Sequence, residues 1–75
     1  AEGDVRDALE HHRGQRAATL QSYREIERRD FPHPDSADSR RVLQHQILKL
    51  GIQVEEAWLS WCEDTLEALD CLPSE

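Results

Sequence analysis

The chain has 75 residues, of which 33% are charged and 37% are hydrophobic, and its formal net charge is −7 at pH 7. A chain of this length forms one small domain, which we take as residues 1–75. Such a domain buries only about 60–65% of the surface of its unfolded chain. Contact with nucleic-acid phosphates requires clustered basic residues, whereas this sequence has one lysine and eight scattered arginines. We therefore expect no direct nucleic-acid binding by this chain.

The sequence has no apolar run near the roughly 18 residues that a membrane span requires, and no signal peptide is recognisable. We expect a cytoplasmic protein without membrane contact. Cys62 and Cys71 fall nine residues apart in an apparent helix, about 13 Å along its axis. A disulfide requires Cα atoms within about 7 Å, so these thiols should not pair with each other. An intermolecular disulfide stays open.

The first predicted element is a helix from about residue 4 to residue 30. Asp4 is suited to cap its N-terminus, because an aspartate side chain accepts hydrogen bonds from unpaired N–H groups there. A thin stripe follows in alternating steps of three and four, the spacing of one helix face. His12 and Arg16 lie on this stripe, which indicates that part of the helix either lies near the edge of the apolar contact or meets a polar partner. Its members are Val5, Leu9, His12, Arg16, Thr19, Leu20, Tyr23 and Ile26.

A turn is predicted at about residues 31–35, where Pro32 and Pro34 disfavour helical geometry in the residues before them. Asp35 or Ser36 is suited to cap the next helix, which places Asp38 in its first turn. The second helix is then expected from about residue 36 to residue 72. No segment alternates with the period of a strand. The sequence thus predicts an all-α chain, a two-helix antiparallel hairpin with a long second helix.

The second helix carries two apolar stripes. One contains Leu43, Ile47, Leu50, Val54, Trp58, Trp61, Thr65, Ala68 and Leu72, and the other contains Leu48, Ile52, Glu55, Leu59, Cys62, Leu66 and Leu69. Leu59 and Trp61 are about 200° apart around a helix, which places the stripes on nearly opposite sides. The first helix has a single apolar face, so a hairpin covers only one stripe. Because each exposed Leu or Ile forgoes roughly 1.5–3 kcal/mol, we expect a homodimer with a four-helix arrangement.

Gly51 lies in the middle of the second helix, where glycine costs about 1 kcal/mol relative to alanine. The interpretation we favour is close approach by a neighbouring helix, and a kink or no purpose at all is the alternative. The dimer interface predicted from these patterns consists of Leu50, Gly51, Val54, Trp58, Trp61 and Leu69.

The residues that commonly carry catalysis or bind metals show no strong pattern. His11 and His12 are adjacent and point about 100° apart, which is poor geometry for joint metal ligation. Cys62 lies on an apolar stripe and is interpreted as a buried structural thiol. Glu55 either pairs with an arginine at an interface or marks where its stripe reaches the surface. We expect no metal, no cofactor and no enzymatic activity.

Trp58 and Trp61 are three residues apart on one helix face, where we expect them to form a broad flat aromatic surface. Such a surface is either a structural anchor at a core or dimer interface, or a platform on which flat aromatic ligands stack.

The segment ILKLGIQVEEAWLSWCEDTLEAL, residues 47–69, resembles the last helix of PadR-family transcriptional regulators. The likeness lies in Leu50-Gly51, in the core Leu59-Ser60-Trp61-Cys62-Glu63 and in the leucine-rich end. The upstream DALEHHRGQRAATLQSYREIE looks like the preceding helix of that family. The resemblance implies an all-α C-terminal domain that follows a winged-helix DNA-binding domain and dimerises through its long helices. It also implies aromatic effectors near the dimer interface, for which Trp58 and Trp61 are the matching positions.

No winged helix is recognisable in these 75 residues, so we expect the dimerisation and effector-sensing part of such a regulator, without its DNA-binding half. The alternative is a stand-alone helical interaction protein, such as an adaptor or an antitoxin-like chain, that binds a different protein. A third and weaker alternative is a helical bundle that binds a metal or a small ligand.

Overall fold

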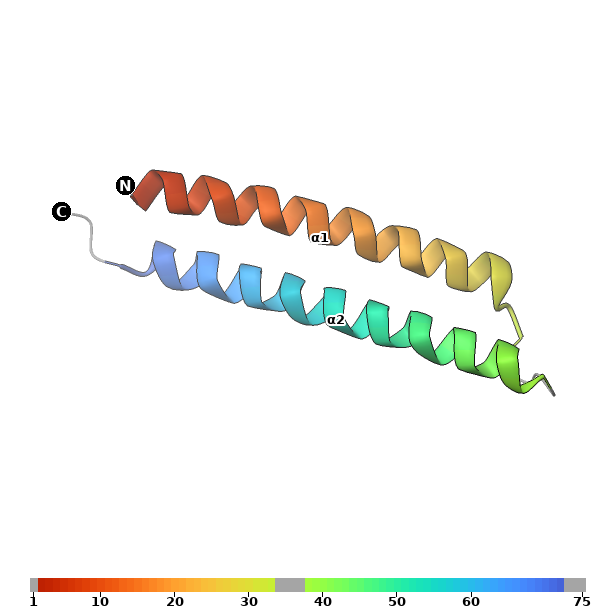
Figure 1. The fold of residues 1–75 in the computed structure, drawn as a ribbon. Coiled ribbons are helices and arrows are strands. Elements are labelled where there is room, and N and C mark those ends of the chain that lie inside the picture. The colour runs from red at the N-terminus through yellow and green to blue at the C-terminus, as the bar shows by residue number, and fades with distance from the viewer. Residues whose placement is uncertain (1, 34–37, 73–75) are drawn as a thin grey trace.

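A computed structural model shows that the protein is a hairpin of two long helices (Figure 1). It describes residues 2–33 and 38–72. Helix α1 spans Glu2–Asp30, and helix α2 spans Ser39–Asp70. The helices run antiparallel, so the start of α1 lies beside the end of α2, and the rod is about 61 Å long and 15 Å wide. The predicted all-α hairpin is confirmed.

The helix ends differ from the predicted ones. Helix α1 begins at Glu2, so Asp4 lies inside the helix and its predicted role as N-cap is wrong. Helix α2 begins at Ser39, and its N-cap is Asp38, which was predicted inside the first turn. The Asp38 residue has extended backbone angles, and its carboxylate accepts the N–H of Arg40 at 3.0 Å. The caps predicted at Asp35 and Ser36 lie outside the described residues.

Helix α2 ends at Asp70 rather than at Leu72, and Cys71 is its C-cap. The N–H of Cys71 donates to the carbonyl oxygens of Glu67 at 3.1 Å and Ala68 at 3.3 Å. These bonds satisfy carbonyl groups that a helix end otherwise leaves without an intrahelical partner.

Helix α1 covers the second of the two stripes of α2. Within that stripe Cys62 is fully buried and Leu66 is 7% exposed, and on α1 Leu20 is 5% exposed. The other apolar members are half-buried, namely Leu48, Ile52, Leu59 and Leu69. The prediction that Cys62 is a buried thiol is confirmed, and it forms no disulfide with Cys71. The core of one hairpin is therefore thin, a single line of side chains between two helices.

One charged pair lies inside this line. Glu55 is 6% exposed, and Arg16 of α1 donates from Nη1 to its Oε1 at 2.9 Å. Two further polar atoms of the pair, Arg16 Nε and Glu55 Oε2, are buried without a hydrogen-bond partner. Of the two alternatives left open for Glu55, the structure supports the buried one paired with an arginine, although this arginine comes from the same hairpin and not from across a dimer interface. This pair also explains why the stripe of α1 contains Arg16.

Two further ion pairs link the helices at the surface. Arg6 pairs with Asp70 near the open end, and Arg24 pairs with Glu56 at 3.2 Å. In each pair an α1 arginine meets an acid in the second half of α2. Exposed pairs of this kind contribute roughly 0–1 kcal/mol each, so they favour the register of the hairpin more than its stability.

The turn end is held by stacked side chains. The ring of Phe31 stacks on His45 with centroids 4.7 Å apart, and the Arg41 guanidinium lies 4.7 Å from the Phe31 centroid. His45 Nε2 is 2.8 Å from Glu27 Oε2, and Arg41 donates to the carbonyl oxygen of Asp30. Two side chains of α2, His45 and Arg41, thus pack against Phe31, the first residue after α1, and their bonds to Glu27 and Asp30 hold the turn end to α1.

Asp30 also receives two hydrogen bonds from Arg29, at 3.0 and 3.1 Å. This hydrogen bond lowers the pKa of Asp30 and raises that of Arg29. Since the pKa of Asp30 is lower in the folded state, the Arg29–Asp30 pair stabilises the fold at pH values above the ordinary pKa of the carboxyl. This contribution to the free energy of folding is lost as the pH falls through the lowered pKa. Both groups contact solvent, which screens the interaction.

Gly51 faces the Tyr23 ring of α1. A Cβ atom at this position would lie 3.2 Å from Tyr23 Cε2, tighter than an ordinary contact. At Gly14, on α1, a Cβ atom would meet nothing within 4 Å. The close neighbour of Gly51 within the hairpin is therefore an aromatic side chain.

We predict that Gly51→Ala yields little or no gain in the free energy of unfolding, because the Tyr23 contact offsets the helix propensity of alanine. Gly14→Ala is the matched control and should gain about 1 kcal/mol. In the double variant Gly51→Ala with Tyr23→Leu, the alanine should recover its gain relative to Tyr23→Leu alone. Urea unfolding followed by helical circular dichroism measures all four, and equal gains at the two glycines would contradict the account.

We predict that Arg16→Met destabilises the fold by about 3 kcal/mol, because it leaves the buried Glu55 carboxylate without a cation. Glu55→Met should cost less, since the Arg16 side chain is 29% exposed and its head can turn to solvent. The double variant should be near neutral, because it also removes the two unpartnered buried atoms. Arg24→Met, at an exposed pair, is the control with a change below about 1 kcal/mol. Additive losses in the double variant would refute this reading.

Candidate protein-interaction face

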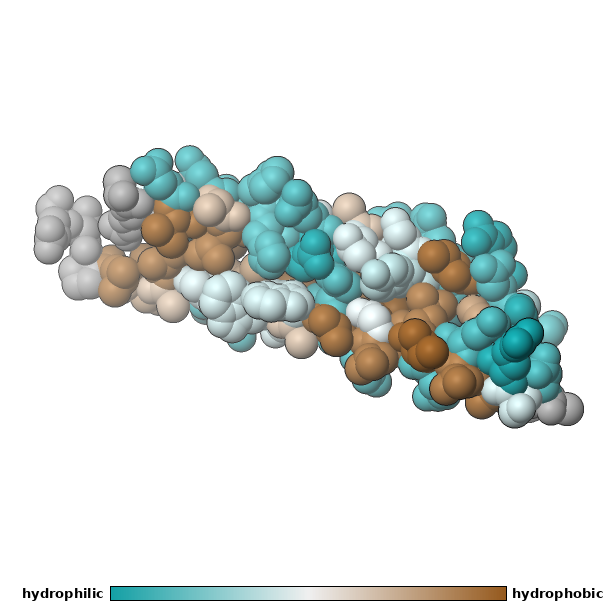
Figure 2. Space-filling view, in the orientation of Figure 1, coloured by the Kyte–Doolittle hydropathy of each residue, from teal (hydrophilic) through white to brown (hydrophobic). Residues whose placement is uncertain are grey.

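The first stripe of α2 stays uncovered in the hairpin, and we call it the outer stripe. Its large side chains are between 44% and 62% exposed, whereas the second stripe is buried or half-buried. Figure 2 shows hydrophobic side chains gathered along α2 on the face it presents, while much of α1 there is hydrophilic. The large members are Leu43, Ile47, Leu50, Val54, Trp58, Trp61 and Leu72.

The outer stripe is continuous along the rod. Its members follow one another in steps of three or four from Leu43 to Ala68, roughly 38 Å along the helix axis, and Leu72 follows just beyond the end of α2. Thr65 and Ala68 fill the remaining positions, so no charged residue interrupts it. Single exposed apolar residues are normal on a protein surface, whereas a contiguous apolar patch of this length is typical of an interaction site. The stripe is therefore the strongest candidate site on the described residues.

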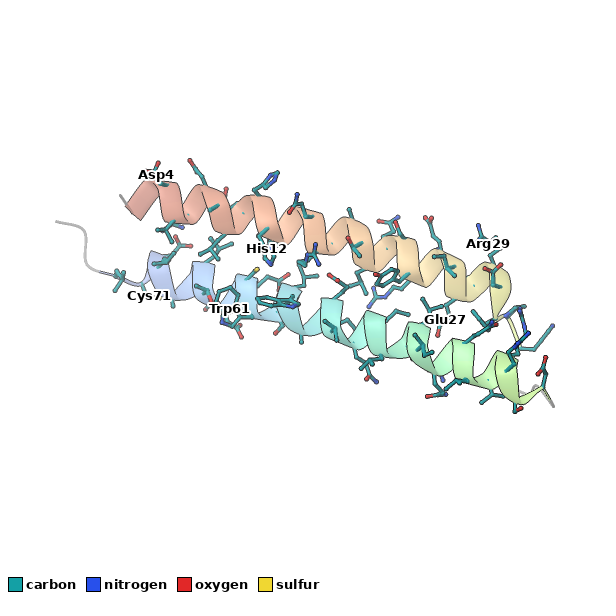
Figure 3. All side chains as sticks on the ribbon, viewed as in Figure 1. Asp4, His12, Glu27, Arg29, Trp61 and Cys71 are labelled. Carbon is teal, nitrogen blue, oxygen red and sulfur yellow. The ribbon has the colours of Figure 1, made fainter. Side chains whose placement is uncertain are left out.

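The outer stripe lies next to the interface between α1 and α2. The ring of Trp58 meets the ring of His12 edge to face, with centroids 5.4 Å apart, and Figure 3 shows His12 directed toward α2. The prediction that the two stripes lie on nearly opposite sides is wrong. It relied on one pair, Leu59 and Trp61, whereas the centres of the full stripes are about 110° apart at 100° per residue. The outer stripe thus shares a face with α1.

The two tryptophans stand perpendicular to each other. Their ring centroids are 5.8 Å apart with an interplanar angle of 86°, an edge-to-face arrangement that aromatic pairs favour. The prediction of a single flat surface is wrong, because rings three residues apart need not be coplanar. Together with His12 they form an aromatic corner in which both indoles remain about half exposed.

An apolar groove opens beside the outer stripe near the turn. It has a volume of about 430 Å³, and Ile47 belongs both to its lining and to the stripe. The groove receives residues from both helices and from the turn, and Gly51 leaves space in it next to Tyr23. It is lined by Tyr23, Ile26, Phe31, Gln44, Ile47, Leu48 and Gly51. A volume of this size is within the range of small-molecule sites.

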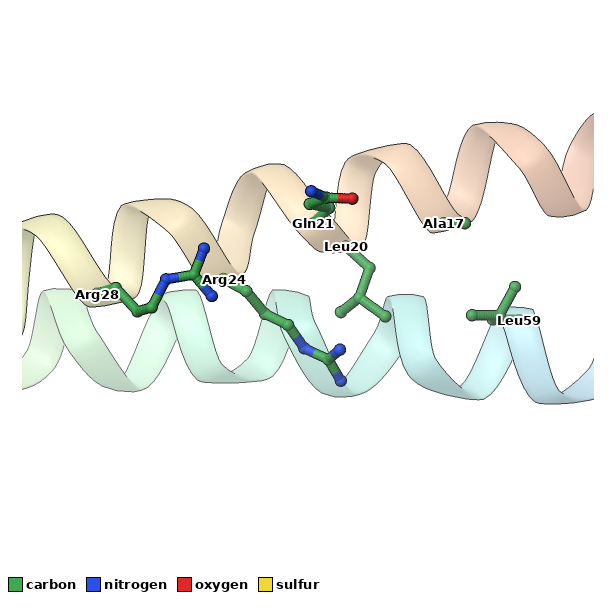
Figure 4. Close-up of a pocket in the computed structure, with 6 residues that line it drawn as sticks. All are labelled: Ala17, Leu20, Gln21, Arg24, Arg28 and Leu59. Carbon is green, nitrogen blue, oxygen red and sulfur yellow. The ribbon is translucent and has the colours of Figure 1, made fainter.

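A second hollow of about 340 Å³ has a more polar lining (Figure 4). Arg24 reaches from α1 toward α2 across this hollow and is already paired with Glu56 at 3.2 Å. The lining consists of Ala17, Leu20, Gln21, Arg24, Arg28 and Leu59. With one cation engaged in the hairpin itself, this hollow is a weaker candidate than the outer stripe.

The residues predicted for a dimer interface divide into two groups. Four of them lie together on the outer stripe, namely Leu50, Val54, Trp58 and Trp61. Gly51 faces Tyr23, and Leu69 is half-buried on the stripe that α1 covers. The predicted interface omitted three exposed residues of the same stripe, which the three–four spacing was sufficient to find: Leu43, Ile47 and Leu72.

Residues 2–33 and 38–72 contain no group of three or more His, Cys, Asp or Glu placed to hold a metal ion. His12 and His45 instead pack against aromatic rings. Neither of the two described helices is apolar enough over a sufficient length to cross a lipid bilayer.

Comparison with known proteins agrees with a role in transcription regulation. The family profile described as Virulence activator alpha C-term matches residues 2–70. The chain is also similar to the probable transcriptional regulator Rv1176c of Mycobacterium tuberculosis, with 37% identity over 57 residues. That match covers 76% of this chain and 30% of the relative, and no solved structure matches. The chain therefore belongs to the virulence activator alpha C-terminal family and is a transcription-regulator-like C-terminal domain.

Proposed function

We propose that this chain is the dimerisation and effector-sensing module of a PadR-type transcriptional regulator, in which a second copy covers the outer stripe. The observation that carries the proposal is the uncovered stripe itself, seven large apolar side chains in unbroken helical spacing. The family match and the similarity to a probable transcriptional regulator support the regulatory setting.

The energetics support a partner on this face. In a homodimer both copies bury their stripe, so covering the exposed half of fourteen large side chains is worth roughly 10–20 kcal/mol, if complete burial of each is worth about 1.5–3 kcal/mol. Association costs an estimated 4–15 kcal/mol in lost freedom of motion. Contributions from α1 and from half-buried residues beside the interface between α1 and α2 add to the first figure. A dimer that uses the whole stripe is therefore energetically reasonable, and one that uses a fraction of it is not.

The angle between the two stripes supports a four-helix arrangement. In a four-helix bundle each helix packs against two neighbours and needs two apolar sides that are less than half a turn apart. Helix α2 has such sides, one toward α1 and one along the outer stripe. Two hairpins that meet through their outer stripes bring four helices around one core.

In this proposal regulation is geometric. DNA is read by winged-helix units outside these residues, and the dimer sets the distance between two such units. Half-sites on DNA are commonly one helical turn apart, about 34–36 Å, so a shift of the long helices changes the fit. The mycobacterial relative extends well beyond the matched stretch, which is consistent with a module that works within a longer protein.

The effector we propose is a flat aromatic small molecule that binds beside the dimer interface. The groove near the turn offers aromatic walls in Tyr23 and Phe31, and the outer stripe adds the half-exposed faces of Trp58 and Trp61. Binding there would bias the packing of α2 on its neighbour. The proposal assigns the chain no catalytic step and no cofactor, and it places the regulator in the cytoplasm.

We predict that Val54→Glu weakens self-association at least 100-fold, because it buries a charge in the middle of the interface. Gln53→Glu adds the same charge at the neighbouring exposed position outside the stripe and is the matched control, with little expected change. Analytical ultracentrifugation over a range of concentrations measures both.

Equal effects of these two substitutions would show that the outer stripe is not where copies meet. A monomeric parent chain would instead favour the alternative of a stand-alone interaction protein that binds a different partner.

We predict that a planar aromatic dye such as acridine orange quenches the tryptophan fluorescence of the protein with a saturable titration curve. Trp61→Leu should weaken the apparent affinity about tenfold or more, since stacking on one aromatic ring is worth roughly 1–3 kcal/mol. Val42→Ala, at an exposed position outside the outer stripe, serves as the control. Quenching that rises linearly without saturation would argue against an effector site.

A further inference from the structure

We infer that the second copy lies antiparallel on the outer stripe, with the twofold axis beside Ala57 and Trp58. The inference rests on the proposed homodimer and adds the orientation and register of its two α2 helices. It follows from two features of α2, the distribution of side-chain size along the outer stripe and the distribution of charge between the two halves of the helix.

The outer stripe is self-complementary when one copy is reversed. Its spacing reads nearly the same from either end, so reversal about a point between residues 57 and 58 places stripe positions opposite stripe positions. Three of the four resulting pairs join a larger side chain to a smaller one, and the fourth joins two leucines. They are Leu43 with Leu72, Ile47 with Ala68, Leu50 with Thr65, and Val54 with Trp61, and the Trp58 residues of the two copies lie next to the axis.

A parallel arrangement fills the same interface unevenly. Each residue would then lie opposite its own copy, so Trp58 meets Trp58 and Trp61 meets Trp61. Thr65 would also meet Thr65 and Ala68 would meet Ala68, so the interface would be poorly filled there, one helical turn beyond the two tryptophan pairs. Since interfaces of stable dimers approach the packing density of protein interiors, the reversed arrangement fits better.

Charge is separated along α2 in a way that disfavours the parallel arrangement. Residues 39–51 contain three basic residues and no acidic one, namely Arg40, Arg41 and Lys49. Residues 52–70 contain six acidic residues and no basic one, namely Glu55, Glu56, Glu63, Asp64, Glu67 and Asp70. Reversal sets the basic half of each helix beside the acidic half of its twin, whereas parallel packing sets the two acidic halves together.

Helix α1 follows the same polarity. Between Asp4 and Gln15 its acids outnumber its arginines, three to two. From Arg16 to Asp30 four arginines accompany three acids. The open end of the hairpin is therefore strongly acidic and the turn end is basic, over a rod about 61 Å long. Two such rods attract when reversed and repel when aligned, with most effect at low ionic strength.

The two orientations differ sharply in where the exposed Cys71 thiols lie. In the antiparallel dimer they are on the order of 40 Å apart, because each is about 13 residues from the axis at 1.5 Å per residue. In the parallel dimer they are neighbours. The same reasoning places the two Glu2 residues at opposite ends of the antiparallel dimer, since Glu2 lies at the open end of the hairpin (Figure 1).

Disulfide mapping of the 75-residue chain tests the inference. The background is Cys71→Ser, and the single variants are Leu43→Cys and Leu72→Cys at exposed positions of the outer stripe. Mild oxidation of an equal mixture should give mainly the covalent heterodimer of the two variants. Each variant oxidised alone should give at least fivefold less covalent dimer. Gln53→Cys, off the stripe, is the control and should not crosslink.

Light scattering and circular dichroism on the reduced samples separate the possible failures. Folded dimers in which Leu43→Cys or Leu72→Cys links readily to itself would overturn the antiparallel orientation while leaving the homodimer intact. Folded dimers without the mixed crosslink would overturn the register. A folded monomer in the Cys71→Ser background would overturn the proposed homodimer and this inference with it.

Discussion

The structure depends on a mismatch between its two helices: α1 has one apolar side and α2 has two. The hairpin satisfies one side of α2 by burying Cys62 and Leu66 under α1, and Leu20 of α1 is buried in the same interface between the helices. The other side runs along most of α2 and contacts α1 through Trp58 and His12, and its large residues are about half exposed. A small domain totals only about 5–15 kcal/mol of stability, so an uncovered stripe of this size is a large unused contribution. Every functional proposal for this chain follows from that stripe.

In the proposed function, self-association and effector binding both use helix α2. Helix α2 contributes residues to the hairpin core, to the outer stripe and to the lining of the groove near the turn. Any ligand that fills the groove contacts Ile47, which also belongs to the stripe. The proposed effector groove and the proposed dimer interface therefore share Ile47, which would couple the two directly without a long pathway. Membership of a transcription-regulator family gives that coupling a setting.

The helices and the two-stripe pattern could be predicted from the sequence, because the three–four spacing is a local property. The arrangement of the stripes was harder. A single pair of residues indicated opposite sides, whereas the contact of Trp58 with His12 places the outer stripe next to the interface between α1 and α2. Tertiary contacts could not be read from spacing. The partner of Glu55 on α1, and the Tyr23 ring over Gly51, depend on how far one helix slides along the other.

The most direct test of the central claim is the mass of the purified chain in solution, measured by light scattering as it is diluted. If the outer stripe needs a second copy, the mass should be twice the 8.7 kDa of one chain at micromolar concentration and above. It should fall toward one chain only with loss of helical signal or at high dilution. A well-folded single chain at high concentration would contradict the account, because the stripe would then be stable in water without a partner.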